Sequence, residues 1–175
     1  MSLIRVVVVA MLGVALLVAS PVSAQQAPVN LDAVAEKMPF DVPYGAPISL
    51  ERAQAAIAVV VAEAKKRDWK MNIAVVDSGG NLVAFQRMDG AQLASIQVSE
   101  HKARAAVTYR RETKVFESGI QLSQLNYMLS LDGMIASRGG IPLVEGGKII
   151  GAIGCSGGAG SQDEVVCKLG AATIK

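Results

Sequence analysis

The sequence predicts an α+β fold in which helices pack on an antiparallel sheet. The main observation is a pair of strand-like runs, 72–76 and 82–88, joined by a turn rich in glycine, asparagine and aspartate. A second pair, 141–145 and 148–156, surrounds Gly146-Gly147 in the same way. The first run is apolar at nearly every position, which is typical of a central strand buried on both faces. Helices should therefore cover at least one side of the sheet.

The first 24 residues have the features of a signal peptide. Arg5 supplies the positive charge, 6–18 the apolar region and Val22-Ser23-Ala24 a small-residue cleavage site. The apolar region is shorter than the roughly 20 residues that cross a bilayer as a helix. We predict that residues 1–24 are cleaved and that the mature protein is periplasmic or secreted, with a membrane anchor as the alternative.

The mature chain divides into an arm and a domain. Residues 25–48 are rich in proline and have little periodicity, which predicts an extended N-terminal arm. Phe40 and Tyr44 would pin this arm to the domain or to a neighbouring subunit. Residues 49–175 are sufficient for one compact domain.

Helices are predicted beside the two strand pairs. Ser49 is the N-cap of the first helix, which ends near Arg67. Residues 112–129 indicate short helices broken at Gly119, followed by a loop over 130–140. Ser161 and Glu164 have the spacing of a capping box that opens the last helix.

The helix predicted over 93–109 carries two apolar strips on nearly opposite sides, so it should contact the sheet with one and a ligand or subunit with the other. His101, the single histidine, lies beside the second strip. If His101 is functional, we expect it to be an axial ligand of haem iron. Lys102 or Arg104 would then lie near the haem propionates, and Tyr109 lies on the same strip. The alternative is a solvent-facing residue, since one imidazole specifies nothing by itself.

Cys155 and Cys167 are the two cysteines. In an oxidising compartment they would form a disulfide, and the alternative is a buried pair of thiols. Cys167 lies on the side of the last helix that should face the sheet, whose final strand carries Cys155. The absence of a C-x-x-C-H spacing excludes covalent c-type haem.

Several other functions are disfavoured. The net charge is +2, and the basic residues are dispersed, which gives no electrostatic footprint for nucleic acid. Residues 154–158 match G-x-S-x-G around Ser156, but the histidine precedes this serine, whereas it follows it in the hydrolase fold. Asp163 and Glu164 in the last helix's first turn would repel a phosphate.

Several separated motifs carry a resemblance to a known family. They are NIAVVDSGGNLVAFQRMDGA, Ser95, Lys102-Ala103-Arg104, 139–143, 148–154, Ser156-Gly157-Gly158 and Gln162-Asp163-Glu164. In this order they closely resemble the GlcG/HbpS-like family of small haem-binding proteins, from Ser49 to the last helix.

The resemblance implies a profilin-like domain with about five antiparallel strands flanked by helices, which assembles into homo-oligomers. Some relatives are exported and bind haem, and one kind feeds a redox-sensing system. Others sit in glycolate-utilisation operons or are fused to a corrinoid enzyme. Haem ligation differs among relatives, so the resemblance assigns no axial ligand here.

We therefore expect an exported, oligomeric haem- or tetrapyrrole-binding protein that acts in haem capture, buffering or redox-stress sensing. A rival expectation is an enzyme or accessory protein for a small organic acid, whose carboxylate Arg87, Lys102 or Arg104 would hold. A third is a structural oligomer whose second apolar strip is only an interface.

Overall fold

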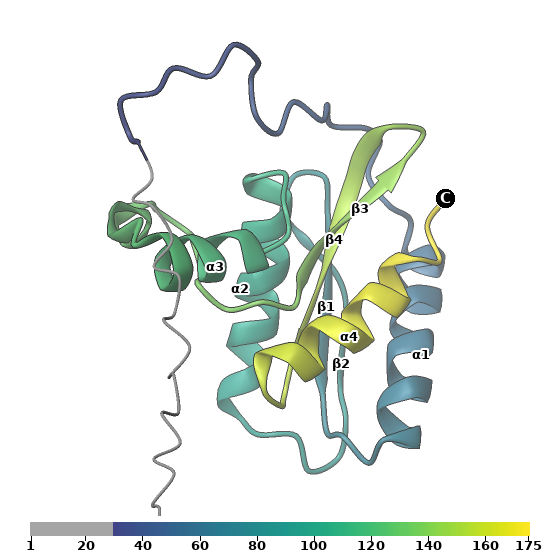
Figure 1. The fold of residues 1–175 in the computed structure, drawn as a ribbon. Coiled ribbons are helices and arrows are strands. Elements are labelled where there is room, and N and C mark those ends of the chain that lie inside the picture. Colours follow the sequence, from purple (N-terminus) through teal and green to yellow (C-terminus); the bar gives the residue numbers. More distant parts are fainter. Residues whose placement is uncertain (1–29) are drawn as a thin grey trace, which may run out of the picture.

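The computed structural model describes residues 30–175, so the signal-peptide prediction and the first part of the arm lie outside the described residues. Figure 1 shows helices arranged around one sheet. The elements in chain order are α1 (Leu50–Lys66), β1 (Asn72–Asp77), β2 (Leu82–Arg87), α2 (Ala94–Thr108), α3 (Lys114–Ser123), the 3-10 helix η1 (Asn126–Ser130), β3 (Gly140–Glu145), β4 (Lys148–Ser156) and α4 (Gly160–Ala171). None of these helices is long and apolar enough to span a bilayer.

The sheet has four strands in the order β2-β1-β4-β3, and each neighbouring pair is antiparallel. This confirms the α+β prediction and both hairpins, with one strand fewer than expected. β4 extends past β1 at Lys148–Ile150, because the β1–β4 pairing stops at Asp77 opposite Gly151. The arm occupies this position with a single parallel bridge between Tyr44 and Ile149 in place of a fifth strand.

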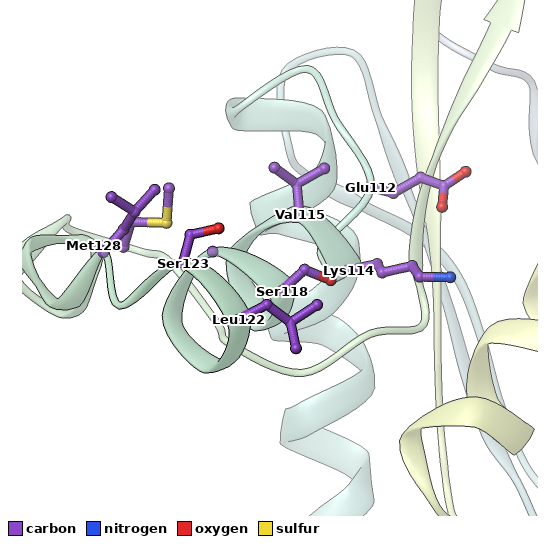
Figure 2. Close-up of a pocket in the computed structure, with 9 residues that line it drawn as sticks. Glu112, Lys114, Val115, Ser118, Leu122, Ser123 and Met128 are labelled. Carbon is purple, nitrogen blue, oxygen red and sulfur yellow. The ribbon is translucent and has the colours of Figure 1, made fainter. Parts of the chain in front are cut away.

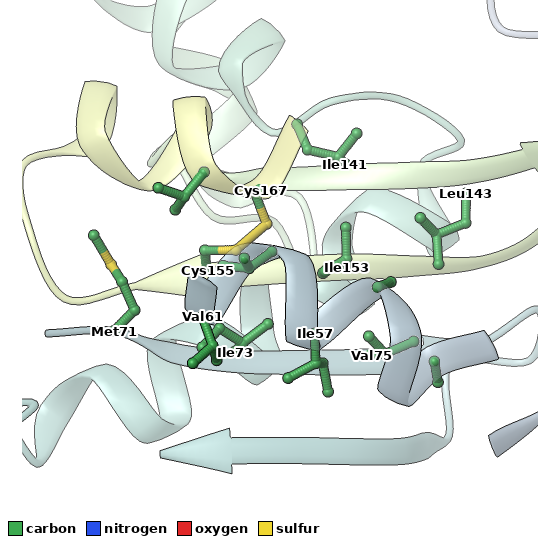
Figure 3. Packing of buried hydrophobic residues seen from close by; sticks show 14 of the residues in the cluster. Ile57, Val61, Met71, Ile73, Val75, Ile141, Leu143, Ile153, Cys155 and Cys167 are labelled. Atoms are coloured by element: carbon green, nitrogen blue, oxygen red, sulfur yellow. A yellow bond between two sulfur atoms is a disulfide. The ribbon is translucent and has the colours of Figure 1, made fainter. Parts of the chain in front are cut away.

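Both faces of the sheet are covered by helices. On one face, large aliphatic side chains such as Ile73, Val75 and Ile153 pack against α1 and α4 (Figure 3). On the other face, Ala74 and Ala152 pack against α2. All the apolar residues of β1 are buried, which confirms the prediction of a central strand.

Helix α2 lies very close to the sheet because glycines on the strands make room for its backbone. A Cβ atom at Gly154 would lie 2.1 Å from the Ser99 carbonyl oxygen. A Cβ atom at Gly140 would lie 2.3 Å from the Lys102 carbonyl oxygen. The α2 side chains that fit between the helix and the sheet are accordingly small ones, such as Ala103 and Ala106.

The ends of the first two helices agree with the sequence prediction, whereas two later predictions were wrong. Ser49 caps α1, and its Oγ accepts a hydrogen bond from Arg52 N at 3.4 Å. Helix α3 continues through Gly119 and ends at Ser123, and the next residue, Gln124, has a left-handed backbone. Helix α4 begins before the expected capping box, since its N-cap is Ala159 and not Ser161.

Phe40 and Tyr44 both attach the arm to the domain. The Tyr44 hydroxyl donates to the Val107 carbonyl oxygen at 3.0 Å, at the end of α2. The Arg111 guanidinium lies 3.3 Å from the centre of the Phe40 ring. The arm is therefore fixed to the end of α2 and to the segment that joins α2 to α3.

Candidate functional site

Lys102 lies in the interior of the domain and not on a ligand-facing surface. Its Nζ donates to Asp163 Oδ2 at 2.7 Å and to the Cys155 carbonyl oxygen at 3.1 Å, and both side chains are almost fully buried. Burial raises the pKa of the Asp163 carboxyl, although the Lys102 ammonium and the Gly158 N–H act in the opposite direction. Lys102 thus joins α2, β4 and α4, and its ammonium is already paired.

His101 and Tyr109 face the loop that precedes β3. His101 Nε2 lies 3.1 Å from the Gly133 carbonyl oxygen, and the Tyr109 hydroxyl donates to the Asp132 carbonyl oxygen. Both side chains are half-buried. In this arrangement the two residues hold the loop against α2.

Arg104 lies apart from these residues on the exposed side of α2, where its guanidinium is 3.1 Å from the Glu100 carboxylate. Of the four predicted haem-binding residues, His101 and Tyr109 therefore contact a loop, Lys102 is in a buried ion pair and Arg104 is in a surface ion pair. The structure does not bring them together around one cavity.

A groove of about 550 Å³ lies along α3 and η1 and is lined mostly by apolar atoms. Figure 2 shows Met128 at one end of this α3 groove and Glu112 and Lys114 at the other. Its lining residues are Glu112, Lys114, Val115, Ser118, Gly119, Leu122, Ser123, Leu125 and Met128. The lack of a side chain at Gly119 allows the Met128 sulfur to pack against α3, since a Cβ there would lie 2.8 Å from Sδ.

A network of charges borders the Lys114 end of the α3 groove. Lys114 Nζ is 3.2 Å from Glu164 Oε1, and Arg138 is paired with both Glu117 and Glu164. Burial tends to raise the pKa of Glu164, but hydrogen bonds from Lys168 and Lys114 lower it overall. The network therefore keeps Glu164 ionised and connects α3 to α4.

Cys155 and Cys167 form a disulfide that joins β4 to α4. Their Cα atoms are 5.6 Å apart, and both residues are fully buried among the aliphatic side chains in Figure 3. Of the two arrangements expected from the sequence, the structure contains the bridged one. Within residues 30–175, no group of three or more His, Cys, Asp or Glu side chains is arranged to hold a metal ion.

The α3 groove was not predicted from the sequence. Val115, Ser118 and Leu122 recur at helical spacing, which would have indicated a helix face. The expected break at Gly119 divided this pattern into two parts. No local sequence pattern indicated the Lys102–Asp163 ion pair, because the two residues are 61 positions apart.

Comparison with known proteins gives consistent matches. Residues 48–172 match the family described as "Haem degrading protein HbpS-like". Protein GlcG of Escherichia coli strain K12 is 39% identical over 109 residues, which are 62% of this chain and 81% of GlcG. A double mutant of Streptomyces reticuli HbpS has a similar structure, with a TM-score of 0.69, 27% identity and coverage of 82% of this chain and 97% of HbpS. The PduOC:haem complex has a similar fold, with a TM-score of 0.66, 23% identity and coverage of 74% and 96%.

Proposed function

Because this chain belongs to the HbpS-like family, we propose that it binds haem or a related tetrapyrrole. The family match over residues 48–172 is the observation that carries this proposal, since the family's description refers to haem. One protein of similar fold was solved as a haem complex, which is consistent with the proposal.

The α3 groove is the cavity that best suits such a ligand. Its volume of about 550 Å³ lies within the range of roughly 300–1,000 Å³ that is usual for cofactor sites. The Met128 thioether is of a type that binds haem iron, and Lys114 is of a type that pairs with a propionate. A bound haem would supply the iron, while the apolar residues along α3 would contact the ring and exclude water.

His101 is the second candidate for the iron ligand. Its Nε2 would have to leave the Gly133 carbonyl oxygen, so iron binding through this atom requires the His101 side chain and the loop before β3 to separate. Tyr109, whose hydroxyl contacts the same loop, would then lie beside the ligand, and Lys102 would remain in its buried pair. The α3 groove and the His101 region are separate and can be tested separately.

The proposal includes export to the periplasm or beyond, assembly into a homo-oligomer, and a role in haem capture, buffering or redox-stress sensing. The signal-peptide pattern of residues 1–24 supports export. Exposed apolar side chains on α3 and η1, among them Leu122 and Leu129, are consistent with subunit contacts.

Haemin titration of the purified protein, followed by absorbance and native mass, tests this proposal. We expect a Soret band that saturates at a fixed ratio of haem to subunit. Leu122→Asp, which places a charge in the α3 groove, should weaken binding by about tenfold or more, equivalent to about 1.4 kcal/mol. Leu129→Asp is the matched control, because Leu129 is similarly exposed but does not line the groove.

Two further variants identify the iron ligand. Met128→Leu conserves volume and should shift the Soret band if the thioether binds iron. His101→Ala should shift it if the imidazole is the ligand, and an unchanged spectrum removes His101 from the site. Weak, non-saturating uptake by the wild-type protein would contradict haem binding altogether.

A further inference from the structure

Among residues 30–175, Arg111 is a half-buried arginine without a negatively charged partner. It lies in the segment that joins α2 to α3. Five other arginines of this part of the chain form ion pairs with carboxylates: Arg52, Arg67, Arg104, Arg110 and Arg138. Arg87 forms none with a described residue, but it is exposed to water on β2. Arg111 therefore differs from the others, because it is partly removed from water and no carboxylate balances its charge.

Aromatic rings surround the Arg111 guanidinium. Its carbon Cζ lies 3.3 Å from the centre of the Phe40 ring, 5.5 Å from that of Phe116 and 6.0 Å from that of Tyr109. The Tyr109 and Phe116 rings also meet edge to face, with their centres 5.0 Å apart. Aromatic rings attract a cation through their faces but carry no net charge. They therefore hold the guanidinium in place without neutralising it.

The hydrogen bonds of Arg111 leave one edge of the guanidinium free. Nε donates to the Tyr109 carbonyl oxygen at 2.9 Å, which fixes the orientation of the group. The two Nη atoms carry the other four N–H groups, and within residues 30–175 no atom accepts a hydrogen bond from them. A carboxylate can accept two parallel N–H groups from such an edge at once. The free edge of Arg111 therefore has the geometry of a carboxylate receptor.

The surroundings of Arg111 favour an anion at this edge. Burial lowers the pKa of its guanidinium, and the nearby Arg110 guanidinium acts in the same direction, although the Tyr127 and Tyr109 hydroxyls oppose them. Arginine nevertheless stays protonated in proteins, so the cation is held at an energetic cost. A carboxylate bound at the free edge would offset this cost.

The acidic side chains close to Arg111 along the chain or in the arm have other partners. Asp41 Oδ1 of the arm lies 3.9 Å from Arg110 Nη1. Glu112, which follows Arg111, has its Oε2 atom 3.1 Å from Lys168 Nζ. A carboxylate for Arg111 therefore has to come from another molecule.

We propose that Arg111 binds the carboxylate of a small-molecule ligand through its two Nη atoms, with Phe40 and Phe116 beside the apolar part of the ligand. Phe40 belongs to the arm, so the arm forms one wall of this site. The inference does not rest on haem binding. A haem propionate and a free organic acid present the same group to Arg111, and the test below separates these two sources.

An NMR titration of the purified protein with benzoate, with the arm intact and no haem present, tests for a free acid. The backbone amide signals of residues 110–112 report on the site. We expect benzoate to shift them to saturation. Benzamide has a similar shape but no charge, and it should cause no saturable shift, because it cannot pair with the guanidinium.

Arg111→Lys keeps the positive charge but lacks the forked edge, so it should weaken benzoate binding about tenfold or more. Arg87→Lys is the matched control, because Arg87 also lacks an ion pair with a described residue but is exposed. It should bind benzoate as the wild-type protein does, and an equal loss in both variants would overturn the proposal. Urea unfolding checks the fold of each variant. If Arg111→Lys does not fold, the wild-type comparison of benzoate with benzamide decides.

Haemin and its dimethyl ester, in which both propionates are blocked, separate the two sources. A propionate at Arg111 predicts that Arg111→Lys weakens binding of haemin but not of the ester. Saturable benzoate binding with unchanged haemin affinity assigns the site to a free organic acid. Equal responses to benzoate and benzamide, together with unchanged haemin affinity, would overturn the proposal. If the wild-type protein binds no haemin, the proposed haem function fails alone, and the benzoate titration decides whether Arg111 binds a carboxylate.

Discussion

The two faces of the sheet are held by different kinds of contact. Against α1 and α4, large aliphatic side chains such as Ile73 and Ile153 fill the space, and the Cys155–Cys167 disulfide adds a covalent link. Against α2, small residues bring the backbones together, and a buried ion pair reaches from Lys102 to α4. Side-chain size on a strand thus decides how close a helix approaches, and close approach lets one polar side chain connect both layers of helices.

Lys102→Met should have the largest effect on this arrangement. The substitution leaves the Asp163 carboxylate buried without its cation, which typically costs about 3–5 kcal/mol of unfolding free energy. Urea unfolding measures the loss. Adding Asp163→Asn to the same chain should recover part of it, because the remaining group is neutral. An equal or larger loss in the double variant would show that the pair is not what stabilises this contact.

Removing the disulfide should have a somewhat smaller effect on the opposite face. The bridge joins two residues that are 12 positions apart in the sequence. For a loop of this length, the loop-entropy model gives a stabilisation of about 3 kcal/mol. The variant with both Cys155→Ala and Cys167→Ala should unfold at lower urea concentration but remain folded in water, since the aliphatic packing around it persists. An unchanged midpoint would mean that this packing alone fixes α4 to β4.

The smallest of the expected effects is a difference between α3 and α1 in how strongly acid loosens them. Burial tends to raise the pKa of Glu117, but hydrogen bonds from Arg138 lower it below the ordinary value of 4.5. A carboxylate with a lowered folded pKa stabilises the protein above the unfolded pKa, and this contribution is lost as pH falls through the folded pKa. Amide exchange should therefore show α3 loosening in acid before α1.

Glu117→Gln is the matched variant for this comparison. It should cost about 1 kcal/mol at neutral pH, because a charge-assisted hydrogen bond to Arg138 is weakened. It should also reduce the acid-induced loosening of α3. If α3 and α1 lose protection together in both proteins, the charges around Arg138 do not stabilise α3 selectively.

Much of the fold follows from local sequence patterns. The hairpins at 72–87 and 140–156 were predicted because strand periodicity and turn residues are local, and Ser49 marked the start of α1 for the same reason. Whether Gly119 interrupts a helix depends on the space that Met128 fills, and this is a tertiary property. The start of α4 at Gly160 was missed because Glu164, expected in a cap, instead pairs with Lys114 and Arg138.

The candidate site was less predictable than the fold. The helix carrying His101 was located correctly, but the surroundings of Lys102 depend on α4 and those of Tyr109 on the loop before β3. A buried lysine and an exposed one have the same local sequence signature. The α3 groove depends on the position of η1 relative to α3, which no local pattern specifies.

The pairing of β1 with β4 has a consequence for folding kinetics. Each hairpin is closed by a short turn, but the seam between them places Val76 opposite Ala152, far apart along the chain. Contacts of such large sequence separation are costly in loop entropy and slow to form. We expect the transition state for folding to be the encounter of the two preformed hairpins. Substitutions in the turns should therefore slow folding, because the hairpins are already formed in that state, whereas substitutions along the seam should change both the folding and the unfolding rate.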